Sequence, residues 1–307
     1  MFNTLFFLAF ASLSQNRVHP SAWRRYRKEV HFALGATNFL GDLGGRGKVG
    51  THYSPADLNL PSTNFAVAAG YRYRFNQWFY LSSVFNFLVV EGNDKLTSEP
   101  ARHNRNLNFK SNIFELAPRG EVVIFSSRIP TSYSIAGLVG NLKKRAVYQL
   151  SVFAGVGGFY FNPEGQTTNG AWVNLRPLHT EGQGLPGGPK EYSNYSVCIP
   201  VGILLRFLVT KNWVIGFEAC HRITFTDYID DVSGTYYDPQ KLTKAYGSLS
   251  AQMADPSLGQ IKGATLPNAD GSPAQRGNPK DKDAYFTFQF TFGYMFKTQH
   301  NRTRTKF

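Results

Sequence analysis

The residues best suited to carry out chemistry lie in one short stretch, residues 225–231, which reads FTDYIDD. His221 precedes the stretch, and Asp281 and Asp283 follow at the far end of the same loop. Closely spaced carboxylates and a histidine can serve general acid–base catalysis. However, aspartates that follow a strand and precede a Gly-containing turn commonly satisfy backbone donors. By strand parity His221 faces the opposite way, so we expect no catalytic group and no enzyme activity.

Hard oxygen ligands in the same loop could alternatively hold calcium. The candidate ligands are Asp227, Asp230, Asp231 and Asp238, although their spacing does not match an EF-hand loop. A competing interpretation is a salt bridge that closes the loop, from Asp230 or Asp231 to Arg276 or Lys280. No P-loop, dinucleotide-binding fingerprint or zinc-ligand spacing occurs in the sequence, so we expect no cofactor.

A second set of charged residues lies within segments of alternating polarity. Its members are Arg72, Arg74, Glu115, Arg119, Glu121, Arg206, Glu218 and Arg222. Because acids and bases are mixed, and because a lone charge in an enclosed interior is costly, we expect them to form a salt-bridged plug.

Strands with a period of two must position these side chains. Eight segments alternate in this way: 29–40, 64–75, 78–90, 108–125, 146–161, 195–209, 213–226 and 284–296. Within 195–209, Val197, Val201 and Ile203 share one face, whereas Cys198 and Arg206 lie opposite. Eight is an even number, as bacterial single-chain barrels require. The sequence therefore predicts an all-β fold: an eight-stranded antiparallel transmembrane up-and-down β-barrel.

Connection lengths support the same fold, because membrane barrels have short periplasmic turns and long extracellular loops. The predicted outer loops are 41–63, 91–107, 162–194 and 227–283, and the inner turns at 76–77 and 210–212 are tight. The inner connection 126–145 is too long for a turn and is interpreted as a short helix or a partner-contacting insertion. Eight strands enclose an interior that side chains fill, which argues against a general porin.

Composition agrees with a membrane barrel. The chain of 307 residues contains 26 Phe, 16 Tyr and 4 Trp, but its mean hydropathy is only −0.29. Beyond the N-terminus no apolar run approaches the roughly 20 residues of a transmembrane helix. Ring-bearing residues at strand ends, namely Trp78, Tyr80, Tyr148, Phe161 and Trp213, are candidates for an aromatic girdle. Cys198 and Cys220 are out of register for a disulfide and are interpreted as interior packing residues.

The formal charge of +13 comes from basic clusters outside the predicted spans. We expect residues 1–14 to be a signal peptide, 15–28 a basic periplasmic segment, 29–296 the barrel and 297–307 a basic tail. For an exported barrel, the expected partners are outer-membrane lipids, lipopolysaccharide or a periplasmic protein, and not nucleic acid. Candidate partner contacts are Arg24, Arg25, Lys143, Lys144 and Arg145. The run 102–110, RHNRNLNFK, could bind lipopolysaccharide phosphates or be an ordinary solvated loop.

Several motifs carry a resemblance to a known family. They are HFALGATNFLGDLGG, RNLNFKSNIFELAPRGEVVIF, VFAGVGGFYFNP, LRPLHTEGQG, HRITFTDYIDDVSGTYYD and QRGNPKDKDAY. In this order they resemble the Bacteroidota outer-membrane barrels that include PorG of the type IX secretion and gliding apparatus. The resemblance implies an eight-stranded barrel that associates with a periplasmic ring lipoprotein. The 126–145 insertion and the tail after residue 296 depart from the shorter members.

From the residues and the resemblance together we expect a non-enzymatic outer-membrane barrel that anchors or scaffolds a secretion or gliding assembly. The alternatives are a small ligand-binding or transport barrel and, less favoured, an outer-membrane enzyme with a site at Asp230 and Asp231.

Overall fold

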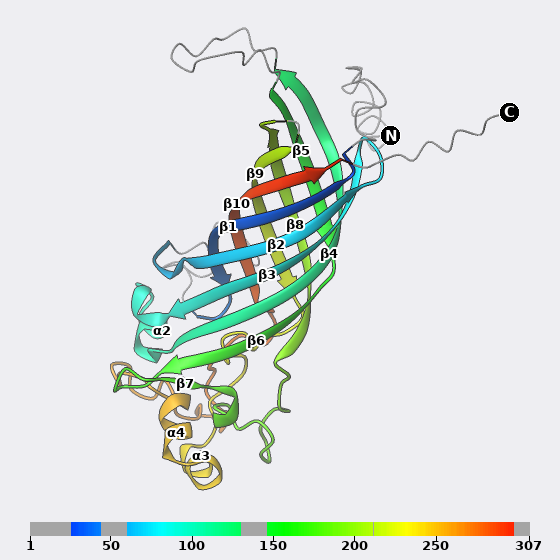
Figure 1. The fold of residues 1–307 in the computed structure, drawn as a ribbon. Helices are drawn as coiled ribbons and strands as arrows, with labels where there is room; N and C mark the ends of the chain where they lie inside the picture. The colour runs from blue at the N-terminus through cyan, green and yellow to red at the C-terminus, as the bar shows by residue number, and fades with distance from the viewer. Residues whose placement is uncertain (1–25, 44–59, 130–145, 211, 298–307) are drawn as a thin grey trace, which may run out of the picture.

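The computed structural model describes residues 26–43, 60–129, 146–210 and 212–297 (Figure 1). Its strands are β1 (Lys28–Leu40), β2 (Asn64–Arg74), β3 (Phe79–Asn93), β4 (Asn108–Ile129), β5 (Ala146–Gly155), β6 (Gly157–Gln166), β7 (Trp172–Asn174), β8 (Tyr195–Leu208), β9 (Trp213–Thr224) and β10 (Ala284–Phe296). All pairings between these strands are antiparallel.

The strands form a closed barrel. Each strand from β1 to β4 pairs with the next, β8 pairs with β9 and β9 with β10, and β10 returns to β1 along its whole length. β5 and β6 both pair with β4 on one side and β8 on the other, so they are two halves of one barrel strand. The described strands therefore make a ring of eight, which confirms the predicted fold class.

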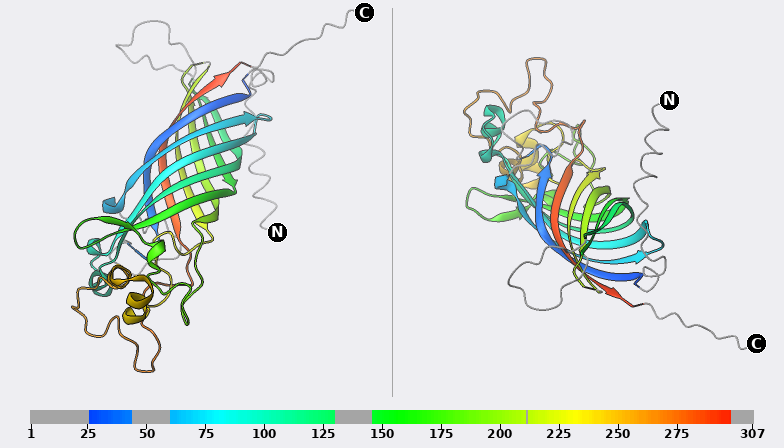
Figure 2. Two further views of the ribbon diagram at one scale, coloured as in Figure 1. Left: turned by 60° about the horizontal axis from the view of Figure 1, so that its bottom comes forward. Right: turned by 90° about the horizontal axis from the view of Figure 1, so that it is seen from above.

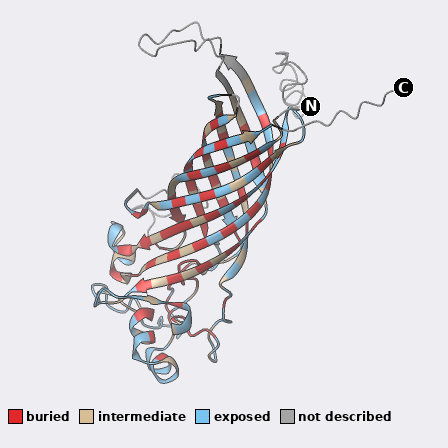
Figure 3. Cartoon of the chain, viewed as in Figure 1, coloured by how far each residue is buried: buried red, intermediate tan, exposed pale blue. Residues whose placement is uncertain are grey.

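Side-chain alternation explains why these segments form the wall. In β10, Phe288, Phe290 and Phe292 are exposed on the outside, whereas Thr287 and Gln289 between them are buried inside. The same alternation runs round the ring, as the banding along each strand in Figure 3 shows. In β8, Cys198 and Arg206 are buried and Val201 is exposed, so the predicted faces of this strand are confirmed. The outside is apolar and the lumen is mostly polar.

Three details of the predicted strands are wrong. The fifth strand was predicted to be continuous over 146–161, but it is interrupted at Val156, between β5 and β6. β4 continues to Ile129 and pairs there with the start of β5, so the 126–145 connection begins as strand. Tyr80 and Phe161 are buried in the interior instead of joining a girdle, whereas Trp78 and Trp213 are exposed.

One end of the barrel carries long connections that fold into a cap, and the other end carries the short β2–β3 and β8–β9 turns together with the β4–β5 connection (Figures 1 and 2). We call residues 41–43, 94–107, 167–194 and 225–283 the cap. Besides β7, it contains α2 (Pro100–Arg105), α3 (Pro239–Tyr246) and α4 (Ser248–Ala254), with 3₁₀ turns at Asp94–Leu96 and Arg176–Leu178. Within the described ranges, no helix combines the length and hydrophobicity needed to cross a membrane.

The largest hydrophobic cluster lies where the cap meets the barrel. Strand residues such as Phe109, Phe161 and Tyr285 pack with cap residues such as Ile229 and Met253. Phe39 and Phe109 meet edge to face with ring centroids 4.7 Å apart. At roughly 25 cal/mol per Å² of apolar area, this burial holds the loops against the end of the barrel. The cap is thus packed into the mouth of the barrel.

Candidate functional site

The lumen near the end with short turns holds a chain of ion pairs centred on Glu29 of β1. Glu29 accepts from Arg72 of β2 at 2.5 Å and also pairs with Arg206 of β8. Arg72 in turn donates through Nε to Glu121 of β4 at 2.7 Å. These four side chains come from four strands and are all buried. They link the wall across the lumen.

The chain of ion pairs continues through Arg119 of β4. Arg119 donates through Nη1 and Nη2 to both carboxylate oxygens of Glu218 on β9, at 2.7 and 2.6 Å. Its Nε donates to Ser82 Oγ at 3.0 Å, and Ser82 donates to Glu121 at 2.6 Å. The guanidinium also lies 4.2 Å from the ring centroid of Phe153. The two-point geometry of the Arg119–Glu218 pair is the strongest form of such a contact.

Nearer the cap, Glu115 of β4 is a second centre. It accepts from Arg222 Nε at 2.8 Å, from the Tyr285 hydroxyl at 2.7 Å and from Asn86 Nδ2 at 2.8 Å. Arg222 also donates to Thr287 Oγ1. Every carboxylate oxygen of Glu115 is therefore satisfied, as a buried charge requires.

The structure places seven of the eight predicted interior charges in this network: Arg72, Glu115, Arg119, Glu121, Arg206, Glu218 and Arg222. Arg74 does not join it, because its guanidinium donates to the carbonyls of Asn76 and Gln77 at the rim. Glu29, which sequence reasoning omitted, completes the set. Its alternation with buried His31 and Ala33 along β1 was the signal that it faces inward. Among the described residues the network balances four arginines with four glutamates.

The outer surface of the ring decides the environment of the protein. Large apolar side chains are exposed outward on strands all round the barrel, including Phe32, Phe65, Leu116 and Ile203. A closed antiparallel ring satisfies every strand edge, and this is the β-architecture that can span a lipid bilayer. The chain is an outer-membrane β-barrel. Its short turns and both ends of the barrel sequence lie at the periplasmic side, and the cap is extracellular.

No protein-family model matches the chain, and no curated protein shows significant similarity to it. Several solved structures are weakly similar to it. Ail of Yersinia pestis, in complex with the heparin analogue sucrose octasulfate, is 10% identical, with a TM-score of 0.36. The alignment covers 88% of this chain and 99% of the Ail chain. Neisserial surface protein A is 8% identical, with a TM-score of 0.33, 88% of this chain covered and 96% of that chain.

The N-terminal β-barrel domain of Pseudomonas aeruginosa OprF is 8% identical, with a TM-score of 0.29, 89% of this chain covered and 99% of that chain. At such low identities and TM-scores, these likenesses assign neither a family nor a function to the outer-membrane barrel.

The four candidate calcium ligands do not converge in the cap. Asp231 accepts from Thr180 Oγ1 at 2.5 Å and from the Tyr192 hydroxyl at 2.7 Å. Asp238 caps the N-terminus of α3 and is exposed, as its position before a helix with Pro at the first turn favours. Across the described part of the chain, no group of three or more His, Cys, Asp or Glu side chains has metal-binding geometry.

Four buried aspartates of the cap have raised pKa values. Burial raises the pKa of Asp227 to about 7, although a hydrogen bond from Ser233 at 2.6 Å favours the carboxylate. Burial raises the pKa of Asp231 to about 6, against the field of Arg276. Burial and the neighbouring carboxylates raise the pKa of Asp230 and of Asp283 well above the usual range. Burial in the cap therefore raises the pKa of all four aspartates.

The salt bridge predicted between Arg276 and Asp230 or Asp231 does not form. Arg276 instead pairs with Glu181 of the third outer loop at 3.0 Å. Its contact with Asp231 is a hydrogen bond to the backbone carbonyl, at 2.6 Å, and not to the carboxylate. Glu181 also accepts from the backbone N–H groups of Ser233 and Gly234. A further ion pair joins the partly buried Arg105 of α2 to buried Asp94 at 2.7 Å. The cap loops are therefore cross-linked to one another.

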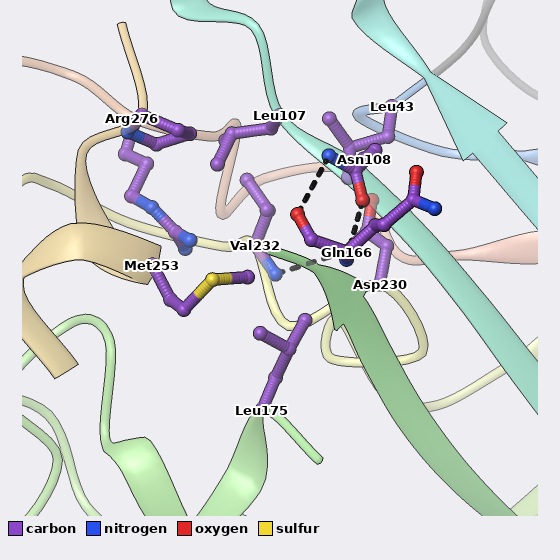
Figure 4. Close-up of a pocket in the computed structure, with 10 residues that line it drawn as sticks. Leu43, Leu107, Asn108, Gln166, Leu175, Asp230, Val232, Met253 and Arg276 are labelled. Atoms are coloured by element: carbon purple, nitrogen blue, oxygen red, sulfur yellow. Dashed lines mark hydrogen bonds between the residues drawn. The ribbon is translucent and has the colours of Figure 1, made fainter. Parts of the chain in front are cut away.

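The contact between cap and barrel is nearly sealed. Figure 4 shows the small space there, of about 10 Å³, where Asp230 and Met253 approach Leu43 and Leu175. Across it, Gln166 N–H donates to Asn108 Oδ1 at 2.7 Å and ties β6 to the start of β4. A space of this size holds at most about one water molecule.

The remaining candidates do not assemble into a site. His221 is half-buried on the outward face of β9, and neither ring nitrogen has a hydrogen-bond partner among the described residues. Cys198 and Cys220 are both free thiols buried in the lumen. The partner-contact candidates Arg24, Arg25, Lys143, Lys144 and Arg145, and the signal peptide of residues 1–14, lie outside the described residues.

Proposed function

We propose that this barrel is a non-enzymatic anchor or scaffold of the outer membrane. The observation that carries the proposal is the lumen, in which four arginines and four glutamates of the described strands pair across the interior. An eight-stranded barrel has room for side chains only, and here those side chains are locked in ion pairs. A barrel whose strands are joined by ion pairs across the lumen suits a rigid membrane anchor better than a channel.

The proposed assembly is the type IX secretion and gliding apparatus, with the barrel as a relative of PorG that binds a periplasmic ring lipoprotein. Two features support it. One is the ordered set of sequence motifs that resembles that group. The other is the periplasmic end, where β4 and β5 continue as a paired hairpin towards residues 130–145, at the end where β1 begins and β10 ends (Figure 1). The basic contacts proposed for this end are Arg24, Arg25, Lys143, Lys144 and Arg145.

The test is affinity purification of a tagged barrel from detergent-solubilised outer membranes, with cross-linking and mass spectrometry, beside a deletion strain scored for secretion and gliding. We expect ring lipoproteins to co-purify and secretion to fail in the deletion strain. A triple substitution of Lys143, Lys144 and Arg145 by Gln should weaken the cross-links, whereas substitution of the exposed extracellular Lys190 should not. A barrel that purifies alone from a strain that secretes normally would contradict the proposal.

Planar-bilayer recording distinguishes the rival transport function. A scaffold with a plugged lumen gives no stepwise conductance, and regular single-channel steps from the purified barrel would favour transport instead.

A further inference from the structure

A cavity of about 290 Å³ opens in the extracellular cap, between α2 and the fourth outer loop. Arg102 and Asn104 of α2 line one side, and Tyr236 and Thr265 line the other, with Asp42 also at the wall. It is far larger than the sealed space between cap and barrel, and its size is at the low end for small-ligand sites. Nothing in the lumen network or the scaffold proposal uses it.

Three hydrogen-bond donors that line this cavity lack partners within the described residues. The Arg102 guanidinium makes no ion pair or hydrogen bond there. Asn104 is 1% exposed, and its Oδ1 accepts from the backbone of Gln260 and Ile261, which leaves Nδ2 without a partner in the described chain. The Tyr236 hydroxyl is likewise unpaired there, although the residue is only 9% exposed. Each of these donors is open to the cavity, so a ligand that accepts hydrogen bonds could reach all three.

The charges at the wall select the kind of ligand. Arg105 and Arg276 are already committed to Asp94 and Glu181, so they form a rigid floor and leave Arg102 to bind an anion. The planar fork of a guanidinium matches a carboxylate.

Asp42 belongs to the same wall. Its Oδ2 accepts from Asn278 N–H at 2.6 Å, and its Oδ1 has no partner among the described residues. That oxygen is therefore suited to accept from a hydroxyl group of a ligand. Burial raises the pKa of Asp42, whereas the nearby Arg105 and Arg102 oppose that rise.

We propose that this cavity binds a small hydroxylated carboxylate, such as a single sugar-acid residue. Its carboxylate pairs with Arg102, and its hydroxyl groups and ring oxygen exchange hydrogen bonds with Asn104, Tyr236 and Asp42. The polar wall disfavours an apolar ligand, because such a ligand would leave these groups unpaired. A scaffold protein can have this binding site or lack it, so failure of the binding proposal would not contradict the scaffold proposal, or the reverse.

The experiment is titration of the purified full-length barrel with D-glucuronate, followed by saturation-transfer NMR, with D-glucose and glycine in parallel. We expect saturable binding of glucuronate and much weaker binding of glucose, which has the hydroxyl groups but no carboxylate. Arg102→Gln should weaken glucuronate binding about tenfold or more, because a charge-assisted hydrogen bond is lost. Tyr236→Phe should weaken it less and leave the fold intact.

Lys190→Gln, an equal loss of charge at an exposed site outside the cavity, is the matched control and should bind as the parent does. Heat-modifiable migration on gels verifies that each variant is folded. Equal binding of glucuronate and glucose, glycine binding without glucuronate binding, or unchanged binding by a folded Arg102→Gln variant would overturn the proposal.

Discussion

Replacing Glu115 by Gln should destabilise the barrel by about 3 kcal/mol. Glu115 is 1% exposed and is the only carboxylate within 4.0 Å of the Arg222 guanidinium among the described residues. Removing one member of a buried pair costs about 3–5 kcal/mol, because the other charge stays buried without compensation. The amide retains the size of the side chain and one acceptor for Tyr285 or Asn86, which favours the lower end of that range.

A second substitution tests the cause. In Glu115→Gln combined with Arg222→Met, no unpaired charge remains in the lumen, so about 2 kcal/mol of the loss should be recovered. Urea unfolding of the barrel in detergent micelles, followed by circular dichroism, measures both variants. Glu191→Gln, the same change at an exposed loop position, should stay within about 0.5 kcal/mol of the parent. If the single variant is as stable as the parent, or if the two substitutions are simply additive, the ion pair is not what stabilises this region.

Three other predictions concern the cap and the closure of the ring. Because the pKa of Asp227 is raised from 3.8 to about 7 in the folded protein, the cap should lose stability as pH rises from about 4 through 7. Near-ultraviolet dichroism melts at acid and alkaline pH should show this loss, and Asp227→Asn should reduce it without abolishing it, since Asp230, Asp231 and Asp283 also have raised pKa values. Glu181→Gln, which leaves Arg276 unpaired, should lower the melting temperature of the cap by several degrees and leave the transmembrane ring intact. Gly35→Val should prevent closure, because a Cβ at Gly35 would lie 2.0 Å from the Phe288 carbonyl oxygen; loss of the heat-modifiable form on gels would show it, while Ala36→Val, facing outward, should fold.

The barrel wall was predictable from sequence because alternation is a local property. The polar Thr287 and the apolar Phe288 indicate which side of β10 faces the lumen and which faces outward. Once those faces are fixed, the register between β10 and β1 follows. Errors arose where type and face disagree. Tyr80 has the chemistry of a girdle residue, but it shares its parity with Ser82 and Asn86 and therefore points inward. Parity was the stronger signal.

The cap was less predictable, because its contacts join loops that are distant in sequence. Nothing local to Arg276 distinguishes Glu181, 95 residues away, from the nearer Asp230 and Asp231 as its partner. The interruption of the fifth strand at Val156 was also missed, since the glycines on either side of it suit a strand as well as a break. Loop geometry depends on packing against the barrel mouth, and the alternation of residue types along the sequence gives no information on that packing.

The length of β4 has a mechanical consequence. Its 22 residues, at about 3.3 Å each, extend roughly 70 Å, more than twice the hydrocarbon thickness of a bilayer. One strand therefore runs from near α2 in the cap to the periplasmic hairpin, with a register shift against β5 between Val123 and Phe125, and it is held to β3 by a ladder from Asn108 to Val122. A pull at the periplasmic end loads that ladder along its length, so many hydrogen bonds resist together instead of opening one by one. The same pairing would let β4 transmit a force from the periplasmic end of the barrel to the cap without opening the wall.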